Sequence, residues 1–407
     1  MIKVVDALCG AGKSTAIYKM MRENPEKKYL YITPFRSEID ERIPKELPEL
    51  DFETPMCKMG KGKVVDFKKL VLEGRNIAAT HVLFSMLTPS LVAMIIEWDY
   101  CLIIDEVTDC VGMLPPAYKK SDIDAMVTGE FVTIDEERRG KLTWNEEKYP
   151  RHDGKYESIR NMCNLDMLYS YKGSFMLWES PTALLQGLSE MYILTYLFRG
   201  SDMRCWLDMN KIVYSYMDNE LLGLRKESEL KAIAKENLKI LDNRNLTQTR
   251  QQKGTLSSSW FTKTKKVDMD KYRAMLRSTV VKHKGDSGGV FWTTFKDSAH
   301  RLAGHGYSIG IKDSDKDKSN KSFLPCNIRA TNDYAEYGLC MYAMNVFKNP
   351  VVVQYMKANG AMVDEDAFSL SEMVQFLWRG CIRKGEPMKL LILSKRMRIL
   401  LEEWLDE

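Results

Sequence analysis

The sequence predicts an α/β protein built on mostly parallel, doubly wound sheets. In the first half, helical patterns separate short β-rich runs, which are IKVVD (2–6), YLYIT (29–33), NIAAT (76–80), CLIID (101–105) and YILTYLF (192–198). In the second half, a similar α/β pattern opens with VFWTTF (290–295) and closes with KLLILS (389–394), followed by an amphipathic helix. Strands that alternate with helices favour a parallel sheet with helices on its faces.

Size and composition indicate an ordinary globular protein. The chain has 407 residues, of which 44% are hydrophobic and 29% charged, and this length predicts two or three domains. Its apolar runs are shorter than the roughly 20 residues that cross a bilayer, so we expect a cytoplasmic protein with no membrane partner. The nine cysteines include no CxxC pair, which favours reduced, buried thiols. A net charge of +4 is too small to indicate a nucleic-acid partner by itself.

The first β-rich run ends in the loop ALCGAGKS (7–14). The phosphate-loop pattern GxxxxGK[ST] presents backbone N–H groups and a helix N-terminus to phosphates, and its lysine reaches the β and γ groups. Here Ala7 stands at the first glycine position. A β-rich run before the loop and a helical pattern after it favour a nucleotide site over a plain turn. The residues predicted to bind the nucleotide are Gly10, Ala11, Gly12, Lys13, Ser14 and Thr15.

A second candidate feature is the segment CLIIDEV, which places Asp105 and Glu106 after an apolar run. Phosphoryl transfer needs a ligand for magnesium and a group that positions the attacking water. We therefore expect Asp105 and Ser14 to hold Mg²⁺ and Glu106 to polarise the water, with ATP and Mg²⁺ as cofactors. Taken alone, the pair could equally be a strand that runs into a solvated turn.

These motifs resemble those of the superfamily 2 helicases and translocases, which are RecA-like P-loop ATPases; a phage-type member is one form that the resemblance allows. Their first motif, AxxGxGK[ST], matches Ala7, Gly10, Gly12, Lys13 and Ser14. The resemblance implies two RecA-like doubly wound parallel-sheet domains with a helical, basic insertion between them. From the changes of composition along the chain we expect the boundaries 1–205 for the ATP-binding domain (with an insertion at about 113–185), 206–284 for the connecting region and 285–407 for the second domain.

The resemblance also implies roles for residues outside the phosphate loop. Contacts with the nucleic-acid backbone would come from Thr33, Pro34 and Arg36 in YITPFR and from Thr80 and His81 in AATH, and Thr195 in ILTY would couple hydrolysis to movement. NIRATND (327–333) stands where the coupling motif of the second domain belongs. Each threonine, taken singly, is also typical of a turn.

The segment VQFLWRGCIRKG resembles the family motif that crosses the domain interface. Gln375 and Arg379 have the family spacing, and Arg383 lies one residue later than the usual second arginine. The resemblance implies that an arginine stabilises charge on the γ-phosphate, and both candidates stay open. A solvated helix face is the alternative for this pair.

Positive charge is concentrated between residues 244 and 284. The segment contains eleven basic residues against two acidic ones, Asp268 and Asp270; the basic residues are Arg244, Arg250, Lys253, Lys263, Lys265, Lys266, Lys271, Arg273, Arg277, Lys282 and Lys284. Trp260, Phe261 and Tyr272 lie among them, as in surfaces that bind single strands. We expect Lys263, Lys265 and Lys266 to contact nucleic acid, although a solvated linker is an equal alternative.

The sequence therefore predicts an ATP hydrolase that works as a nucleic-acid helicase or translocase. We expect nucleic acid as the partner, DNA in preference to RNA, with replication or recombination proteins as further partners. Two alternatives stay open: an ATP-driven nucleic-acid clamp or remodelling switch that does not unwind, and a P-loop small-molecule kinase. A kinase would not require the Gln375–Arg379 segment.

Overall fold

The computed structural model describes residues 1–56, 62–84, 87–114, 118–150, 154, 156–309, 322–326 and 334–407. The chain forms two compact units. The first comprises Met1–Asp6, Lys13–Asp218 and Lys348–Val363, and the second comprises Ala7–Gly12, Asn219–Phe347 and Asp364–Glu407. The predicted coupling segment 327–333 lies outside the described residues. None of the described helices combines the length and the apolar character needed to traverse a bilayer.

The first unit is built on a parallel sheet with the strand order β11-β1-β10-β4-β2-β3 among the described residues. The pairings in this sheet are parallel. Its strands are β1 (Ile2–Asp6), β2 (Tyr29–Thr33), β3 (Ile77–Thr80), β4 (Cys101–Asp105), β10 (Met191–Thr195) and β11 (Tyr214–Tyr216). The five β-rich runs of the first half thus form strands of one parallel sheet, so this part of the prediction is confirmed.

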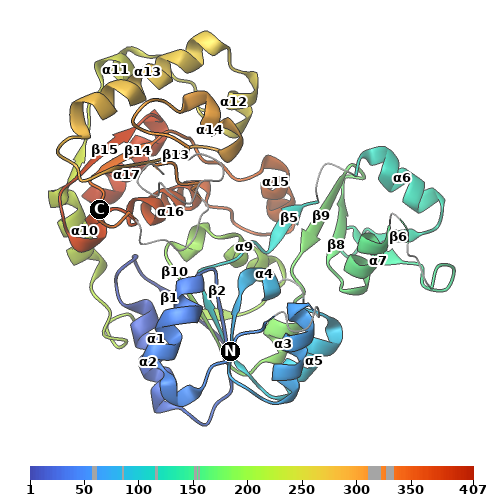
Figure 1. Ribbon diagram of the computed structural model, residues 1–407. Helices are drawn as coiled ribbons and strands as arrows, with labels where there is room; N and C mark the ends of the chain where they lie inside the picture. Colours follow the sequence, from blue (N-terminus) through green and yellow to red (C-terminus); the bar gives the residue numbers. More distant parts are fainter. Residues whose placement is uncertain are drawn as a thin grey trace. The chain divides into compact units, whose positions relative to one another are not determined.

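Helices cover both faces of this sheet (Figure 1). The helices of this unit outside its inserted segment are α1 (Lys13–Glu23), α2 (Ile43–Glu46), α3 (Lys63–Leu72), α4 (His81–Phe84), α5 (Pro89–Glu97), α8 (Ala183–Gly187), α9 (Asp202–Met209) and α15 (Pro350–Ala358). Val4 of β1 belongs to the same core as Leu91 and Ile95 of α5. Tyr18 of α1 packs against Tyr31 of β2, with ring centroids 5.9 Å apart. Both faces can be covered because successive side chains of a strand point to opposite faces.

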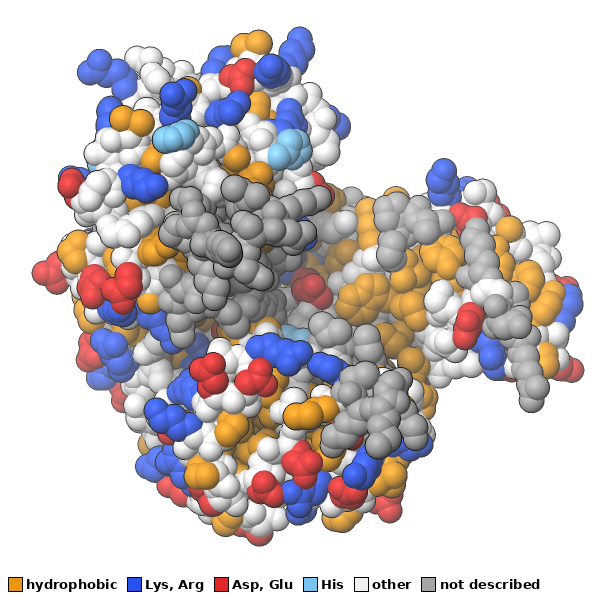
Figure 2. Space-filling view, viewed as in Figure 1, with side chains coloured by type: hydrophobic (Ala, Val, Ile, Leu, Met, Phe, Trp, Pro, Cys, Tyr) orange, Lys and Arg blue, Asp and Glu red, His pale blue; other side chains and the backbone are white. Residues whose placement is uncertain are grey.

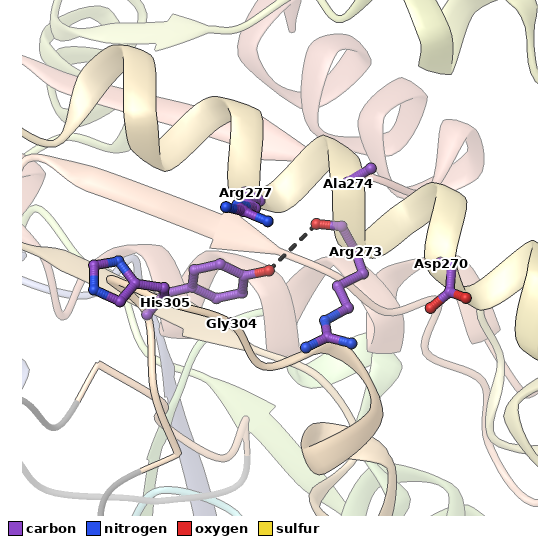
Figure 3. A pocket seen from close by; sticks show the side chains of 7 residues that line it. Asp270, Arg273, Ala274, Arg277, Gly304 and His305 are labelled. Atoms are coloured by element: carbon purple, nitrogen blue, oxygen red, sulfur yellow. Dashed lines mark hydrogen bonds between the residues drawn. The ribbon is translucent and has the colours of Figure 1, made fainter.

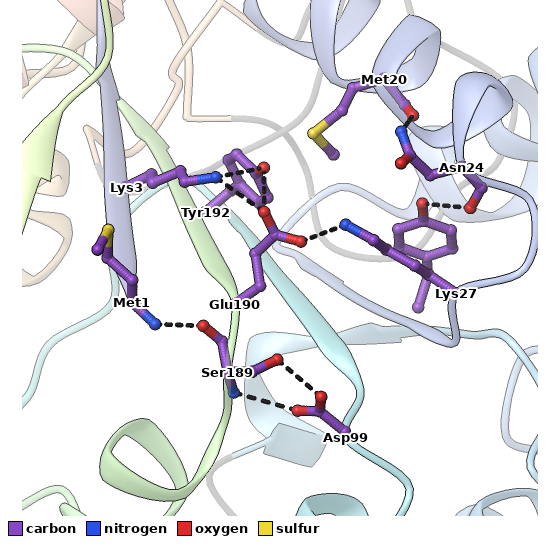
Figure 4. Close-up of polar contacts among 10 residues, drawn as sticks. Met1, Lys3, Met20, Asn24, Lys27, Asp99, Ser189, Glu190 and Tyr192 are labelled. Carbon is purple, nitrogen blue, oxygen red and sulfur yellow. Dashed lines mark hydrogen bonds and ion pairs between the residues drawn. The ribbon is translucent and has the colours of Figure 1, made fainter.

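A charged cluster links the elements at the amino ends of β1 and β10 (Figure 4). The Glu190 carboxylate accepts hydrogen bonds from the ammonium groups of Lys3 (2.8 Å) and Lys27 (2.5 Å) and from the Tyr192 hydroxyl (2.7 Å). Burial alone raises the pKa of Glu190, but the hydrogen bonds from Lys27, Lys3 and Tyr192 outweigh it and lower the pKa to about 2. The cluster therefore stabilises this end of the sheet while Glu190 is ionised.

The segment between β4 and β10 contains an antiparallel sheet of order β5-β9-β8-β7-β6 within the described residues. Its strands are short, and its apolar side chains form a separate small core with two helices. The sequence pattern predicts an insertion here but not its structure. Its elements are β5 (Val111–Met113), α6 (Lys120–Thr128), β6 (Val132–Asp135), β7 (Lys141–Trp144), α7 (Glu157–Asn164), β8 (Leu168–Tyr171) and β9 (Phe175–Glu179).

The second unit contains a parallel sheet of order β12-β15-β14-β13 in the part of the chain that is described. The runs VFWTTF and KLLILS supply β13 (Val290–Thr293) and β15 (Met388–Ile392), as predicted. The remaining strands are β12 (Leu238–Ile240) and β14 (Leu339–Tyr342). The helices of this unit are α10 (Glu227–Asn237), α11 (Arg244–Gln248), α12 (Ser258–Lys263), α13 (Lys266–His283), α14 (Ala299–Leu302), α16 (Glu365–Leu377) and α17 (Lys395–Asp406).

Helices of the second unit also lie on both faces of their sheet (Figure 1). Leu276 of α13 and Trp292 of β13 belong to one core. On the opposite face, Phe376 of α16 packs against Phe291, with ring centroids 5.4 Å apart. The described cysteines are free thiols, and most of them are buried, in agreement with the prediction. The chain is therefore an α/β protein with parallel sheets and one antiparallel insertion.

The charged cluster around Glu190 leads to a prediction about pH. Glu190→Gln should lower the free energy of unfolding at pH 7 by about 1 to 2 kcal/mol, because two charge-assisted hydrogen bonds are lost from a partly exposed site. The pKa of Glu190 is lower in the folded chain than in the unfolded chain. Its contribution is therefore complete above pH about 4.5 and disappears as the pH falls towards 2. Urea unfolding of parent and variant between pH 7 and pH 3 measures this.

Glu73→Gln is the control, since Glu73 forms an exposed pair with Lys69 at 3.5 Å. We expect no measurable change for this variant. A difference between parent and Glu190→Gln that is the same at pH 7 and pH 3 would contradict the assignment.

Candidate functional site

Polar residues stand in one row at the carboxyl edge of the first sheet. Asp6 pairs in register with Thr195, and Thr33 pairs with Thr80. Between these pairs, Asp105 ends β4, opposite β10. In open parallel α/β sheets, ligands bind outside the carboxyl ends of the strands. The sheet thus brings together strand ends that are far apart in the sequence, from Asp6 to Thr195.

The loop that follows β1 contains two glycines with left-handed backbone. Gly10 has φ +84° and Gly12 has φ +103°, conformations that residues with a β-carbon adopt only under strain. Between them, the Ala11 N–H donates to the Leu8 carbonyl at 3.1 Å, and the Ala11 carbonyl accepts from the Arg225 N–H at 3.0 Å. The glycines are therefore required by the course of the loop itself.

Helix α1 begins at Lys13, directly after this loop. Its first turn contains Lys13, Ser14 and Thr15, so backbone N–H groups without an intrahelical acceptor lie at these residues. The Lys13 side chain is buried, Ser14 is half-buried, and the exposed Thr15 accepts a hydrogen bond from Arg42 at 3.0 Å. This end of the helix has the partial positive charge that favours phosphate groups.

Asp105 is a buried carboxylate, with 5% of its surface exposed. Its Oδ2 accepts hydrogen bonds from the Tyr31 hydroxyl (3.0 Å) and the Thr33 hydroxyl (3.5 Å). Burial, followed by the charges of Glu106 and Glu38, raises the pKa of Asp105 to about 7, although the Tyr31 hydrogen bond and the charge of Lys13 oppose the rise. A bound cation would stabilise the ionised form of the Asp105 carboxylate.

Glu106 has an unusual backbone conformation, with φ +68°. A left-handed glutamate is uncommon and costs on the order of 1 kcal/mol or more. Its N–H donates to the Leu194 carbonyl of β10 at 2.8 Å, and this bond fixes the residue at the carboxyl edge of the sheet. Strained residues of this kind cluster at functional sites.

The remaining predicted residues of the first unit lie at or just after the same edge. Thr33 and Thr195 are fully buried, whereas Thr80 and His81 are half-buried. The Thr33 hydroxyl accepts from the Phe35 N–H at 3.2 Å in addition to its bond to Asp105. Thr33 therefore positions a carboxylate, a role that the sequence did not indicate. Its contact with nucleic acid stays a prediction, as does the coupling role of Thr195.

Pro34 and Arg36 lie just after Thr33. Pro34 is half-buried, and Arg36 is exposed, with its guanidinium 3.9 Å from the Asp40 carboxylate. Arg36 is thus accessible to a ligand.

Gln375, Arg379 and Arg383 belong to the second unit. Gln375 lies in the last turn of α16 and donates to the Ser371 hydroxyl at 3.2 Å. Arg379 is half-buried just after this helix, whereas Arg383 is exposed in the short turn Cys381–Lys384. The two arginines therefore differ in environment, and both stay candidates for the role that the resemblance implies.

The basic stretch 244–284 folds into α11, α12 and α13, so the linker alternative is wrong. Lysine and arginine side chains gather over these helices in Figure 2, and Lys263, Lys265 and Lys266 are exposed.

A second expectation for this stretch is also wrong: its aromatic residues do not form an exposed surface on which bases could stack. Phe261 and Tyr272 are buried in the core under α13, and Trp260 packs against that core. The aromatic residues anchor the helices, whereas the lysines of the stretch face solvent.

Sequence reasoning missed a set of residues around Asp105. Glu38, buried just after β2, accepts hydrogen bonds from the Tyr18 hydroxyl and from Arg42 (3.1 Å). Burial, followed by the Glu38 charge and hydrogen bond, raises the pKa of Tyr18 far above its usual value. Tyr31 resembles any apolar strand residue in the sequence, and only the pairing of β2 with β4 reveals its partner. No local signal marks this set.

The fold and this site define a class: α/β proteins with Rossmann-like parallel sheets, an inserted antiparallel sheet, and polar residues gathered at the carboxyl edge of a parallel sheet. Residues 232–405 match the family described as the YonV C-terminal Rossmann-like domain, and residues 117–178 match the YonV middle domain. The SPbeta prophage-derived uncharacterized protein YonV of Bacillus subtilis (strain 168) is 30% identical over 428 residues, covering 100% of this chain and 98% of the relative. The chain belongs to the YonV family.

Two solved structures are similar in backbone course. A structure described as an XPD helicase is 11% identical, with 99% of this chain and 94% of that chain covered and a TM-score of 0.49. The structure of S. tokodaii Xpd4 is 12% identical, with the same coverage of 99% and 94% and a TM-score of 0.46.

The left-handed conformation of Glu106 leads to a prediction about stability. Glu106→Gly should raise the free energy of unfolding relative to Glu106→Ala by about 1 kcal/mol, because only glycine relieves the clash of a β-carbon at positive φ. Glu106→Ala is the matched control, since it removes the carboxylate but keeps the β-carbon. Thermal unfolding of both variants measures the difference. Equal stability of the two variants would show that the backbone is relaxed in solution.

Proposed function

We propose that this protein is an ATP-dependent nucleic-acid motor of the superfamily 2 type, a helicase or translocase that hydrolyses ATP. The proposal combines three features: a loop with the AxxGxGKS sequence, a carboxylate pair on a neighbouring part of the sheet edge, and exposed cations on a second α/β unit. ATP, Mg²⁺ and nucleic acid, with DNA in preference to RNA, are the proposed ligands.

The observation that carries the proposal is the arrangement of strand ends in the first unit. β10 lies between β1 and β4. β1 leads to the loop before Lys13, and β4 ends at Asp105, so only one strand separates the two strand ends. The charge of Lys13 acts on the Asp105 carboxylate across this separation. A lysine, a magnesium-binding carboxylate and a second acidic side chain are the parts that phosphoryl transfer requires.

Each residue then has a defined task. Lys13 and the N–H groups of the first turn of α1 bind phosphate oxygens. Ser14 and Asp105 would hold magnesium, and the ion would supply positive charge beside the substrate phosphates. Tyr31 and Thr33 orient Asp105 through their hydrogen bonds. Glu106 accepts the proton of the attacking water.

Hydrolysis and its dependence on nucleic acid test the proposal. Purified protein should hydrolyse ATP faster with single-stranded DNA, RNA or duplex than without any nucleic acid. Lys13→Ala should abolish turnover, because the ammonium group that counters the phosphate charge is lost. Steady-state ATPase assays of parent and variant measure both effects.

Lys19→Ala is the matched control, since Lys19 is an exposed lysine of the same helix, 3.9 Å from Glu23. This variant should retain the parent rate. Turnover by Lys13→Ala at the parent rate would refute the phosphate loop. ATP consumption stimulated by a small acceptor molecule instead of nucleic acid would favour a kinase. Stimulation by nucleic acid without strand separation or movement along a strand would favour a clamp or remodelling switch.

A further prediction distinguishes the two candidate arginines. The superfamily resemblance assigns to Arg379 or Arg383 the stabilisation of charge on the γ-phosphate. Replacing the correct arginine by alanine should leave ATP binding nearly intact and slow hydrolysis by about 10³-fold, whereas the other replacement should be mild. Binding of a fluorescent nucleotide and single-turnover hydrolysis measure the two quantities. Parent rates for both single variants and for the double variant would contradict the role that the resemblance gives to this segment.

A further inference from the structure

A pocket on the second unit lies between α13 and the turn at residues 304–307. It has a cavity volume of about 440 Å³ and is lined by Asp270, Arg273, Ala274, Arg277, Gly304, His305 and Tyr307. Figure 3 shows Arg273 and Arg277, which come from successive turns of α13, and His305 from the turn at residues 304–307, as parts of this lining. Among the described residues that line the pocket, Asp270 is the one that carries a carboxylate.

The turn that closes this pocket is held firmly. The Tyr307 ring is fully buried, and its hydroxyl donates to the carbonyls of Leu302 (3.0 Å) and Arg273 (3.3 Å). The Lys284 ammonium donates to the Gly306 carbonyl at 3.2 Å, and Gly306 itself has φ +86°. The pocket is therefore formed before any ligand binds, which reduces the entropy cost of binding.

The guanidinium groups of Arg273 and Arg277 are available to a ligand. Both residues are exposed, and within the described part of the chain neither forms an ion pair. Burial raises the pKa of the Tyr307 hydroxyl to about 12, and the charges of Arg273 and Arg277 oppose that rise. Both cations therefore act on the interior of the pocket.

These arginines are part of a longer basic stripe, which we define as Lys266, Arg273, Arg277 and Lys284. The spacings place Lys266, Arg273 and Arg277 on one side of α13, since a helix has 3.6 residues per turn, and Lys284, the residue directly after the helix, continues the same spacing. The helix has 18 residues, so the stripe is about 27 Å long. Asp270 is an acidic residue on the same side.

We propose that the pocket binds a backbone phosphate of single-stranded nucleic acid and that the basic stripe directs the strand along α13. The assignment rests on the proposed function for the choice of nucleic acid. A guanidinium presents planar pairs of N–H donors that match phosphate oxygens. Because the stripe extends along α13 beyond the pocket lining to Lys266, it fits a polymer of phosphates and not one isolated anion.

The test measures binding of a fluorescently labelled single strand of about 20 nucleotides at several salt concentrations. The variant Arg273→Ala/Arg277→Ala should bind at least about 10-fold more weakly than the parent. Its slope of log affinity against log salt should be smaller by about 0.7, since the pocket binds one phosphate and each lost phosphate contact on a single strand reduces the slope by about that amount. Both side chains are exposed, so the thermal unfolding temperature should stay at the parent value.

The matched control is Lys271→Ala/Lys282→Ala, which removes the same charge from the same helix. Lys271 and Lys282 are exposed and lie about 140 to 160° around α13 from Lys266. This variant should keep the parent affinity within about twofold. An equal loss of affinity in both double variants would contradict the assignment of a phosphate to this pocket. The loss would then reflect only the net charge of the helix.

A chemical readout locates the contact and identifies the source of the phosphate. Phenylglyoxal modification of Arg273 and Arg277, followed by mass spectrometry, should be slowed at least about fivefold by the unlabelled strand but not by inorganic phosphate at the same phosphate concentration. Protection by inorganic phosphate alone would overturn the assignment to a strand.

Two further outcomes separate this inference from the proposed function. If the parent binds the strand and Arg273→Ala/Arg277→Ala binds it equally well, the pocket assignment is wrong while the nucleic-acid partner stands. A parent that binds no strand would overturn the proposed nucleic-acid partner as well.

Discussion

The parallel pairing of β10 with both β1 and β4 is the constraint on which the candidate site depends. Because β10 is inserted between these strands, its register fixes where each of them ends relative to the other. Asp6 lies opposite Thr195, and Leu194 lies opposite Asp105. The N–H of Glu106 completes the arrangement by donating to the carbonyl of Leu194. A shift of β10 by one residue would reverse the faces of its side chains and would disrupt this alignment of strand ends.

The same arrangement has an energetic cost that is concentrated at two adjacent residues. Asp105 is buried among groups that raise its pKa, and Glu106 adopts a backbone conformation that glycine tolerates better. Neither feature helps the chain to fold. The surrounding sheet compensates through apolar side chains such as Ile103 and Leu194, which are fully buried. A stable sheet that supports a strained, partly desolvated acidic pair is typical of a site selected for chemistry.

The sequence predicted those parts of the structure in which local pattern and tertiary role coincide. The buried strands of the parallel sheets have long apolar runs, so β1, β2, β4 and β15 were identified close to their observed ends. The glycine loop is predicted because Gly10, Gly12, Lys13 and Ser14 match the phosphate-loop pattern between a β-rich run and a helical pattern. The inserted antiparallel sheet escaped prediction, since its strands are short and its apolar residues form a small core of their own. A period-2 signal over so few residues is too weak to recognise.

The hydrogen-bond partners of side chains cannot be predicted from local sequence patterns, for a different reason. Tyr31 bonds to Asp105 across 74 positions of sequence, and nothing near either residue indicates the other. The aromatic residues of the basic stretch were misassigned because a helix presents a different face every few residues. Phe261 and Tyr272 therefore point inward while their charged neighbours point outward. Linear proximity of cations and rings does not place them on one surface.

The pairing of β5 with β9 also bears on how this protein could have acquired its inserted segment. The chain enters the insertion at Val111 and leaves it at Glu179, and these residues are partners in register, so their α-carbons lie about 5 Å apart. Because its two ends lie side by side, the insertion constrains β4 and β10 no more than a short connecting loop would. Its length could change with little entropic cost. The segment thus has the properties of a transferable module, which can be gained, replaced or lost while the strand order around it persists.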